Sequence, residues 1–277
     1  SINGVDIIEL SSYPIYSSVV FDAIFSPTCL NTLVEVSWNG LFEFDGRNIW
    51  VDNENVYYSH GVDQYKLNKE TNTWEEMTWY GVSDFIFLDL FYYKENVYCC
   101  DFNKQFKLNR MTNTWEEMTW NGLPNSLLSG DSFWTDGDDL YYSSGSWNYI
   151  LNENQNLWEE ISWNGISNII SSYIWSDGEN TYYSGGEIQC KLNKETNTWE
   201  EISWNGMTSF YGQYIWTDEE NIYYSSNSNQ YVLNKETNTW EEILWNVITG
   251  FSGIDVWTDG ENFYYSSNEK QYMFIAV

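Results

Sequence analysis

Short runs of alternating apolar and polar residues fill most of the chain, and polar turns separate them. Alternation with a period of two predicts β-strands that turn one face toward a core. An Asp-Gly turn such as Asp177-Gly178 predicts a tight hairpin, because the type I′ turn needs positive φ angles that glycine adopts easily. No segment has helical periodicity of useful length, so the sequence predicts an all-β protein. In one stretch we expect four consecutive strands, at residues 214–218, 221–225, 230–234 and 240–245.

This four-strand unit recurs at a fixed spacing, since 41 positions separate Trp199 from Trp240 and several other markers keep the same period. A tryptophan before Glu-Glu recurs at Trp74, Trp115, Trp158, Trp199 and Trp240. A further aromatic series runs Trp50, Phe91, Trp134, Trp175, Trp216 and Trp257. A four-stranded unit of this length cannot bury both of its faces alone, so it must stack against copies of itself. Radial stacking of six copies predicts a six-bladed β-propeller of antiparallel blades.

The two ends of the chain are predicted to complete one blade together. The last copy stops at Val277 after its third strand, and residues 33–38 form an unclaimed fourth strand near the start. Pairing of these two pieces would close the ring and remove an exposed sheet edge. We therefore expect a propeller over residues 31–277, with residues 1–30 as an N-terminal extension or linker.

The composition supports a folded chain with a large aromatic core, and the net charge limits the classes of partner that the chain is expected to bind. Aromatic residues make up 19% of the sequence, and 41 acidic residues against 11 basic ones give a formal net charge of −30. Such a surface repels phosphate backbones and anionic lipids, so nucleic acid and membrane surfaces are not expected as partners. The cysteines, at Cys29, Cys99, Cys100 and Cys190, have no zinc or disulfide spacing, and Cys190 stands where other copies carry an aromatic core residue. Because the chain begins at Ser1 rather than methionine, the lack of a signal peptide carries no conclusion about the compartment.

The amino-acid sequence of the repeat resembles that of the kelch family. Residues 216–245 contain Asn-Ile-Tyr-Tyr, Ser-Ser and then Tyr-Val-Leu-Asn-Lys-Glu-Thr-Asn-Thr-Trp, which is similar to the hydrophobic strand, small residues and late Trp of a kelch repeat. The paired glycines of that repeat survive at Gly185-Gly186, whereas Ser225-Ser226 and Ser266-Ser267 replace them elsewhere. The resemblance implies a divergent kelch-like propeller. The wording Thr-Trp-Glu-Glu with Trp-Asn-Gly is also similar to repeats of phage and prophage tail proteins, which implies a virion-associated or extracellular place.

The residues needed for known propeller enzymes are scarce. His60 is the sole histidine, which excludes a multi-histidine copper site and an ordinary catalytic zinc site. Arg47 and Arg110 are the two arginines, too few for a sialidase-like arginine cluster. A hydrolytic carboxylate pair stays open, but most acids recur at equivalent places in the copies, as scaffold residues do. We therefore expect no enzyme, no cofactor and no metal site, although cation binding at short acidic turns such as 136–139 is left open.

One face of the predicted ring is expected to bind a ligand. Because strand direction alternates, the segments that enter each blade and the turns between second and third strands lie on the same face, where the copies differ most. We take this variation as the mark of a recognition surface, with unconstrained loop drift as the alternative. Two classes remain, a platform for a protein or cell-surface partner and a lectin whose exposed aromatics stack on sugars; a structural spacer is a third. The candidate ligand-binding residues are His60, Tyr80, Phe102, Trp147, Glu187, Tyr211 and Lys270, with Asn227 in a comparable loop.

Overall fold

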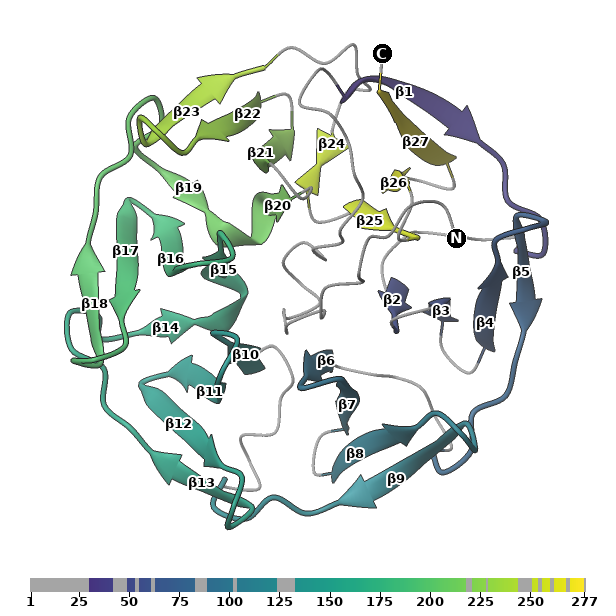
Figure 1. Cartoon of the computed structure of the whole chain (residues 1–277), viewed down its shortest axis with the longest axis horizontal. Coiled ribbons are helices and arrows are strands. Elements are labelled where there is room, and N and C mark those ends of the chain that lie inside the picture. The colour runs from purple at the N-terminus through teal and green to yellow at the C-terminus, as the bar shows by residue number, and fades with distance from the viewer. Residues whose placement is uncertain are drawn as a thin grey trace, which may run out of the picture.

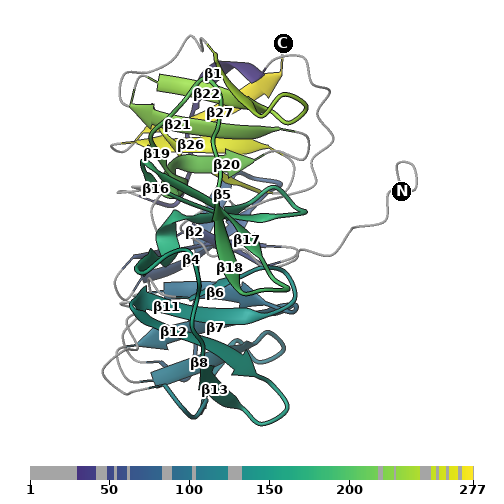
Figure 2. The ribbon, with the colours of Figure 1, turned by 90° about the vertical axis from the view of Figure 1, so that its left-hand side faces the viewer.

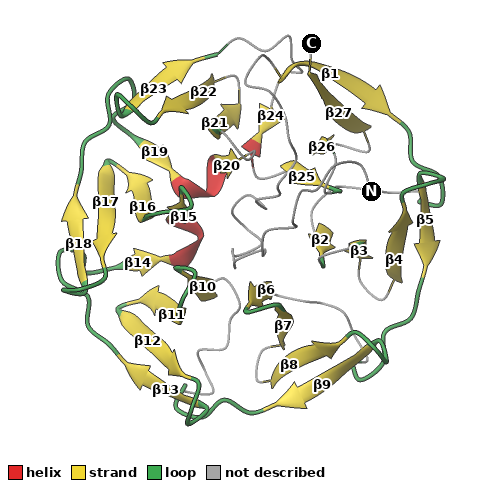
Figure 3. Cartoon of the chain, in the orientation of Figure 1, coloured by secondary structure: helices red, strands yellow, loops and turns green. Residues whose placement is uncertain are grey.

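The computed structural model is a six-bladed β-propeller (Figure 1). It describes residues 30–41, 49–52, 55–60, 63–82, 89–101, 104–123, 133–217, 221–227, 229–243, 251–253, 256–259, 262–267 and 270–276. Seen from the side, the ring is a disc (Figure 2). Helical structure in the described part includes the short turns η2 (Ser171–Tyr173) and η3 (Gly212–Tyr214), which precede β15 and β20 (Figure 3). The all-β prediction is confirmed.

Each blade is an antiparallel sheet. Its first strand lies nearest the ring centre, and the following strands lie progressively farther out. Blade 1 contains β2 (Ile49–Val51), β3 (Val56–His60), β4 (Asp63–Asn68) and β5 (Thr73–Glu76). Blade 2 contains β6 (Asp89–Tyr93), β7 (Asn96–Asp101), β8 (Lys104–Asn109) and β9 (Thr114–Met118). Blade 3 contains β10 (Phe133–Thr135), β11 (Leu140–Gly145), β12 (Trp147–Asn152) and β13 (Leu157–Glu160).

The other three blades follow the same plan. Blade 4 contains β15 (Ile174–Ser176), β16 (Thr181–Gly186), β17 (Ile188–Asn193) and β18 (Thr198–Glu201). Blade 5 contains β20 (Ile215–Thr217), β21 (Ile222–Asn227), β22 (Asn229–Asn234) and β23 (Thr239–Glu242). Blade 6 contains β25 (Val256–Thr258), β26 (Phe263–Ser267), β27 (Lys270–Ala276) and, as its outer strand, β1 (Leu30–Val36).

The outer strand of blade 6 comes from the other end of the chain, as predicted. β1 pairs with β27 in antiparallel register, with Leu33 opposite Phe274 and Val36 opposite Gln271. The two strands lie side by side at the upper right of Figure 1. The strand begins at Leu30, earlier than the predicted residue 33, and ends before Trp38. Phe274 therefore has a partner strand on its open side, and the ring is closed.

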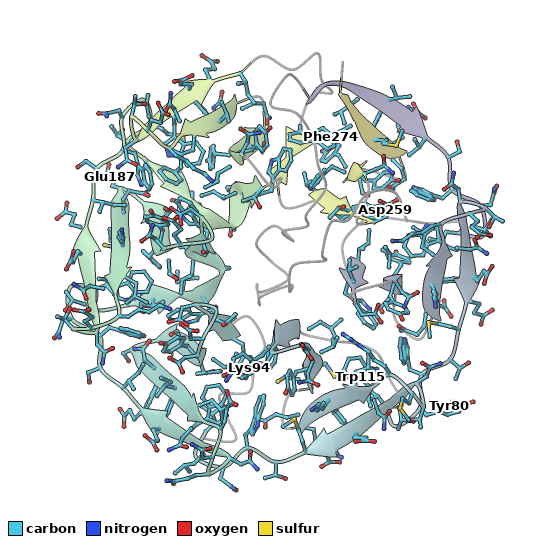
Figure 4. The ribbon with its side chains drawn as sticks, viewed as in Figure 1. Tyr80, Lys94, Trp115, Glu187, Asp259 and Phe274 are labelled. Atoms are coloured by element: carbon cyan, nitrogen blue, oxygen red, sulfur yellow. The ribbon has the colours of Figure 1, made fainter. Side chains whose placement is uncertain are left out.

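Tryptophans from neighbouring blades pack together and hold the ring. Between blades 3 and 4, Trp134 lies 5.8 Å from Trp163 and 6.0 Å from Trp199, ring centroid to ring centroid. The equivalent trios are Trp38, Trp74 and Trp257; Trp50, Trp79 and Trp115; and Trp175, Trp204 and Trp240. Figure 4 labels one member, Trp115. Burying one such side chain contributes up to about 4 to 6 kcal/mol, so these trios dominate the stability of the ring.

The indole N–H of the innermost tryptophan has a partner within its own blade. Trp134 Nε1 donates to Ser143 Oγ at 2.9 Å, and both groups are buried. The same bond recurs from Trp50 to Ser59, Trp175 to Ser184, Trp216 to Ser225 and Trp257 to Ser266. In blade 2, Phe91 and Cys100 stand at the two places. The Phe91 side chain has no N–H to donate, and the serine that would accept the bond is absent as well. The buried donor and its acceptor therefore occur together or not at all.

At five blade junctions of the described residues, a blade is also fastened to the hairpin of the next one. The segment after a fourth strand, Trp-Asn-Gly in most copies, forms a parallel bridge with the following blade, as Asn164 does with Thr198. Asn164 N donates to Asn197 O at 3.0 Å, and Trp199 N donates to Asn164 O at 2.9 Å. We call these the clip segments; their bridging residues are Asn39, Tyr80, Asn121, Asn164 and Asn205.

Candidate binding face

The segments that enter the blades and the turns between second and third strands lie on one face, which we call the entry face. The short strand β14 (Ile169–Ile170), which leads into blade 4, pairs with the end of β11 in blade 3. In the same way β19 (Phe210–Tyr211) pairs with the end of β16, and β24 (Phe251–Ser252) with the end of β21. Each of these three entering segments therefore sits directly beside a turn between second and third strands, as strand alternation predicts.

Exposed apolar side chains gather on the entry face of blades 3 and 4. Of the seven large apolar side chains that are exposed in the described residues, four lie here: Trp147 at 48%, Ile170 at 43%, Ile188 at 53% and Tyr211 at 41%. We call these four residues the apolar patch. The other three, Val34, Tyr80 and Met111, lie on an outer strand, on a clip segment and in a hairpin turn. Soluble proteins rarely leave several large apolar groups together in water without a partner for them.

Strand pairing arranges the patch as two equivalent rows. In blade 3, Ser144 pairs with Trp147 on one side and with Ile170 on the other. In blade 4, Gly185 pairs with Ile188 on one side and with Tyr211 on the other. Directly paired residues point to the same side of a sheet, with strands about 5 Å apart. Each row therefore shows two apolar side chains with a small residue between them.

Packed tyrosines support the row in blade 4. The Tyr211 ring lies 5.2 Å from Tyr173 of η2, which in turn lies 6.1 Å from the ring of Tyr183. A Cβ built on Gly185 would come within 2.8 Å of Tyr183 Cε1, so this buried ring fills the place of a side chain in the middle of the row. Burial raises the pKa of Tyr183, while a hydrogen bond with the Ile170 backbone opposes the rise. The exposed groups thus stand on a rigid aromatic base, which lowers the entropy lost on binding.

The same position differs in character around the ring. Trp147 and Ile188 are the first residues of their third strands, and the equivalent residues are Asp63, Lys104, Asn229 and Lys270. Lys104 Nζ lies 2.8 Å from Glu117 Oε2, and Lys270 Nζ lies 3.1 Å from Glu35 Oε2. Hydrogen bonding to Glu35 raises the pKa of Lys270. Four blades therefore carry a charged or amide group where blades 3 and 4 carry an apolar one.

The structure brings some of the predicted ligand residues together and separates others. Trp147 and Tyr211 belong to the apolar patch, and the exposed Glu187 precedes Ile188 in its turn. Tyr80, 62% exposed, lies on a clip segment at the outer rim, on a different side of the ring from Glu187 (Figure 4). Lys270 lies on the entry face of blade 6, in its pair with Glu35.

The side chains of two predicted ligand residues lie outside the described structure, and the ligand-binding role of all seven stays a prediction. The backbone of His60 ends β3, but its side chain lies outside the described residues, and so does Phe102. Sequence reasoning missed Ile170 and Ile188. Counting the fixed period forward from Trp147 leads to Ile188 rather than to Glu187, so that signal was present in the sequence.

The acidic turns on the opposite face use their carboxylates internally. Asp136 Oδ1 accepts from Asp139 N at 2.9 Å, and Oδ2 accepts from the Tyr141 hydroxyl at 3.1 Å. Lys194 of the next blade lies 3.0 Å from the same carboxylate. In the described part of the chain, no three His, Cys, Asp or Glu side chains are grouped to hold a metal ion. Cys99, Cys100 and Cys190 are buried, and Cys190 fills the core as predicted.

Comparison with known proteins shows the fold. No family model matches the chain, and no curated protein does. Among solved structures, the extracellular domain of a putative one-component system from B. thetaiotaomicron is similar, with 13% identity and a TM-score of 0.53, over 98% of this chain and 39% of that one. The extracellular domain of a putative hybrid two-component system from the same bacterium has 14% identity and a TM-score of 0.49, over 81% and 33%.

The likeness to the extracellular domain of the one-component system supports the β-propeller fold and does not show a family. This chain spans well under half the length of either neighbour. The kelch and phage-tail resemblances stay predictions. Within the described residues, no helix is long and apolar enough to cross a membrane.

Proposed function

We propose that this propeller is a non-enzymatic binding module that recognises a protein partner through the apolar patch on its entry face. One observation carries the proposal: Trp147, Ile170, Ile188 and Tyr211 are all exposed, and they occupy matching places in two adjacent blades. Where Trp147 and Ile188 replace the polar residues of other blades, they are apolar side chains that stay 48% and 53% exposed to water. Exposed aromatic and aliphatic anchors on a rigid base are the usual centres of protein interfaces.

The kelch-like wording of the repeat supports the same class, since that resemblance implies a partner-binding propeller. The resemblance to phage and prophage tail repeats favours a place on a virion or a cell surface. The absence of enzymatic activity is proposed from the supply of residues: one histidine and two arginines are too few for the multi-histidine metal sites and arginine clusters of known propeller enzymes.

The test compares matched variants of the intact chain. In the patch variant, Trp147→Ser and Ile188→Ser are combined; in the control, Asn229→Ser and Lys270→Ser change the same position of blades 5 and 6. Both are checked for folding by thermal unfolding and then screened, with the wild type, against displayed protein fragments from candidate hosts. We expect fragments whose affinity falls at least about thirtyfold in the patch variant and stays near wild type in the control. Fragments that bind all three proteins alike would overturn the proposal.

A lectin is the second candidate, because Trp147 and Tyr211 expose aromatic rings on which sugars could stack. A glycan array separates the two functions. Hits that Trp147→Ala abolishes, with no protein ligand found, would favour the lectin. Two of the four patch residues are isoleucines, which do not stack on sugar rings, and this favours the protein partner.

A further inference from the structure

A carboxylate accompanies each row of the apolar patch, and its position is fixed by strand pairing. Glu160 pairs with Tyr149 in blade 3, and Glu201 pairs with Cys190 in blade 4. Trp147 precedes Tyr149 by two residues, and Ile188 precedes Cys190 by two. Residues two apart on a strand share one side of the sheet, so each glutamate is the diagonal neighbour of a patch residue.

Two other blades show what these glutamates meet when the fold supplies a partner. In blade 2 the diagonal neighbours are Lys104 and Glu117, and their N and O atoms lie 2.8 Å apart. In blade 6 they are Lys270 and Glu35, 3.1 Å apart. The diagonal is therefore short enough for a lysine amine to reach the carboxylate.

Blades 3 and 4 keep the glutamate and lose the lysine. Trp147 and Ile188 stand where Lys104 and Lys270 stand in blades 2 and 6, and where Asp63 and Asn229 stand in blades 1 and 5. Glu160 and Glu201 are exposed, and neither forms an ion pair with a described residue. Each row of the patch therefore has a neighbouring carboxylate that lacks the lysine partner found in blades 2 and 6. The protein as a whole has a net charge of −30.

We propose that the partner is a protein segment that carries basic and apolar side chains together, with its amines or guanidinium groups on Glu160 and Glu201. This rests on the proposed function and deepens it. The apolar side chains of the segment cover the patch, and its basic groups take the place that Lys104 and Lys270 take in blades 2 and 6. Complementary charge of this kind selects the partner and speeds its approach more than it adds affinity.

The two rows also suit a repeated ligand. The pattern of carboxylate, apolar group, small residue and apolar group occurs in blade 3 and again in blade 4 at equivalent places. A segment in which basic and apolar residues alternate could therefore contact both rows. Acidic glycans and anionic lipids are disfavoured, because the uncompensated carboxylates repel them.

The probe is a displayed library of random peptides, selected on the intact wild-type chain at physiological ionic strength. We expect the enriched peptides to combine Lys or Arg with Trp, Phe, Leu or Ile. The carboxylate variant combines Glu160→Gln and Glu201→Gln. Its control combines Glu76→Gln and Glu242→Gln, which remove the same charge at the same position of blades 1 and 5, beside Asp63 and Asn229 rather than beside an apolar group.

The carboxylate variant should weaken binding of the enriched peptides about tenfold, and the control less than about twofold. An equal loss in both variants would mean attraction to net charge alone and would overturn the inference. So would enriched peptides without basic residues, or no enrichment at all. If Trp147→Ser with Ile188→Ser abolishes binding while both glutamine variants behave alike, the apolar patch stands as the site and the basic partner falls. If the serine variant binds like the wild type, both proposals fall.

Discussion

The clip segments give the sharpest prediction about the fold, at Gly165. This glycine has φ +86°, and a Cβ built on it would lie 2.0 Å from the carbonyl oxygen of Trp199 in the next blade. The substitution Gly165→Ala costs about 1 to 2 kcal/mol for the left-handed backbone conformation alone. The contact with a backbone atom must also push the segment away, which breaks the two hydrogen bonds between Asn164 and the hairpin of blade 4, at about 1 kcal/mol each. The total loss should be about 3 to 4 kcal/mol.

Gly178 provides a matched control, since it has φ +91° but no heavy atom within 4 Å of a built Cβ. Gly178→Ala should therefore cost about 1 to 2 kcal/mol, from the backbone conformation only. Both variants are compared with the wild type by denaturant unfolding, followed by near-ultraviolet circular dichroism of the tryptophans between the blades. If the two alanines lower the free energy of unfolding equally, the clip segments do not hold neighbouring blades together.

Three further predictions concern the junction of blades 2 and 3 and the closure of the ring. The Lys94 amine and the Tyr93 hydroxyl both bond to Glu153 of blade 3, whereas between blades 3 and 4 the lysine comes from the later blade. Lys94→Glu should lower stability by about 0.5 to 1 kcal/mol, and adding Glu153→Lys should restore most of it in a double-mutant cycle; equal losses without recovery would refute a pair. Burial alone would raise the pKa of Glu153, but the hydrogen bonds from Lys94 and Tyr93 outweigh burial and lower that pKa. The ionised Glu153 therefore stabilises the fold at neutral pH, and this stabilisation is lost as the pH falls through the lowered pKa. Unfolding measured from neutral pH to about pH 3, below the ordinary glutamate pKa of about 4.3, should show the gap between wild type and Glu153→Gln shrink; a constant gap would contradict this. Deleting residues 1–36 removes β1 and bares the edge of β27, so the shortened chain should melt at a lower temperature and aggregate, and unchanged melting would show that closure contributes nothing.

The sequence predicted the ring because its signals are local and repeated. The spacing of the tryptophans determined the number of blades, and the missing fourth strand of the last copy identified β1 as its complement. Cys190 was placed in the core because aromatic residues occupy its place in other copies. Each of these inferences compares one copy with another, and the comparison needs no knowledge of tertiary contacts.

The candidate site was predicted only in part, because its geometry depends on contacts between blades. Trp147 and Tyr211 were recognised as exposed aromatics, but Ile170 joins them through the pairing of β14 with β11. A two-residue strand has no periodicity to reveal it, and its partner strand β11 belongs to the preceding blade. The ion pair between Lys94 and Glu153 could not be predicted from the sequence for the same reason. The two residues are 59 positions apart and meet only across a blade junction.

The most direct test of the binding role places a photo-crosslinking amino acid at Ile188 in one protein and at Asn229 in another. The two positions are equivalent in blades 4 and 5 and differ in whether the apolar patch surrounds them. Both proteins are irradiated in material from the source organism and its surroundings, and the crosslinked products are identified by mass spectrometry. We predict a protein partner that crosslinks at 188 and not at 229, and that is lost when Trp147→Ser is added. Equal crosslinking at both positions, or none at either, would contradict a binding site on blades 3 and 4.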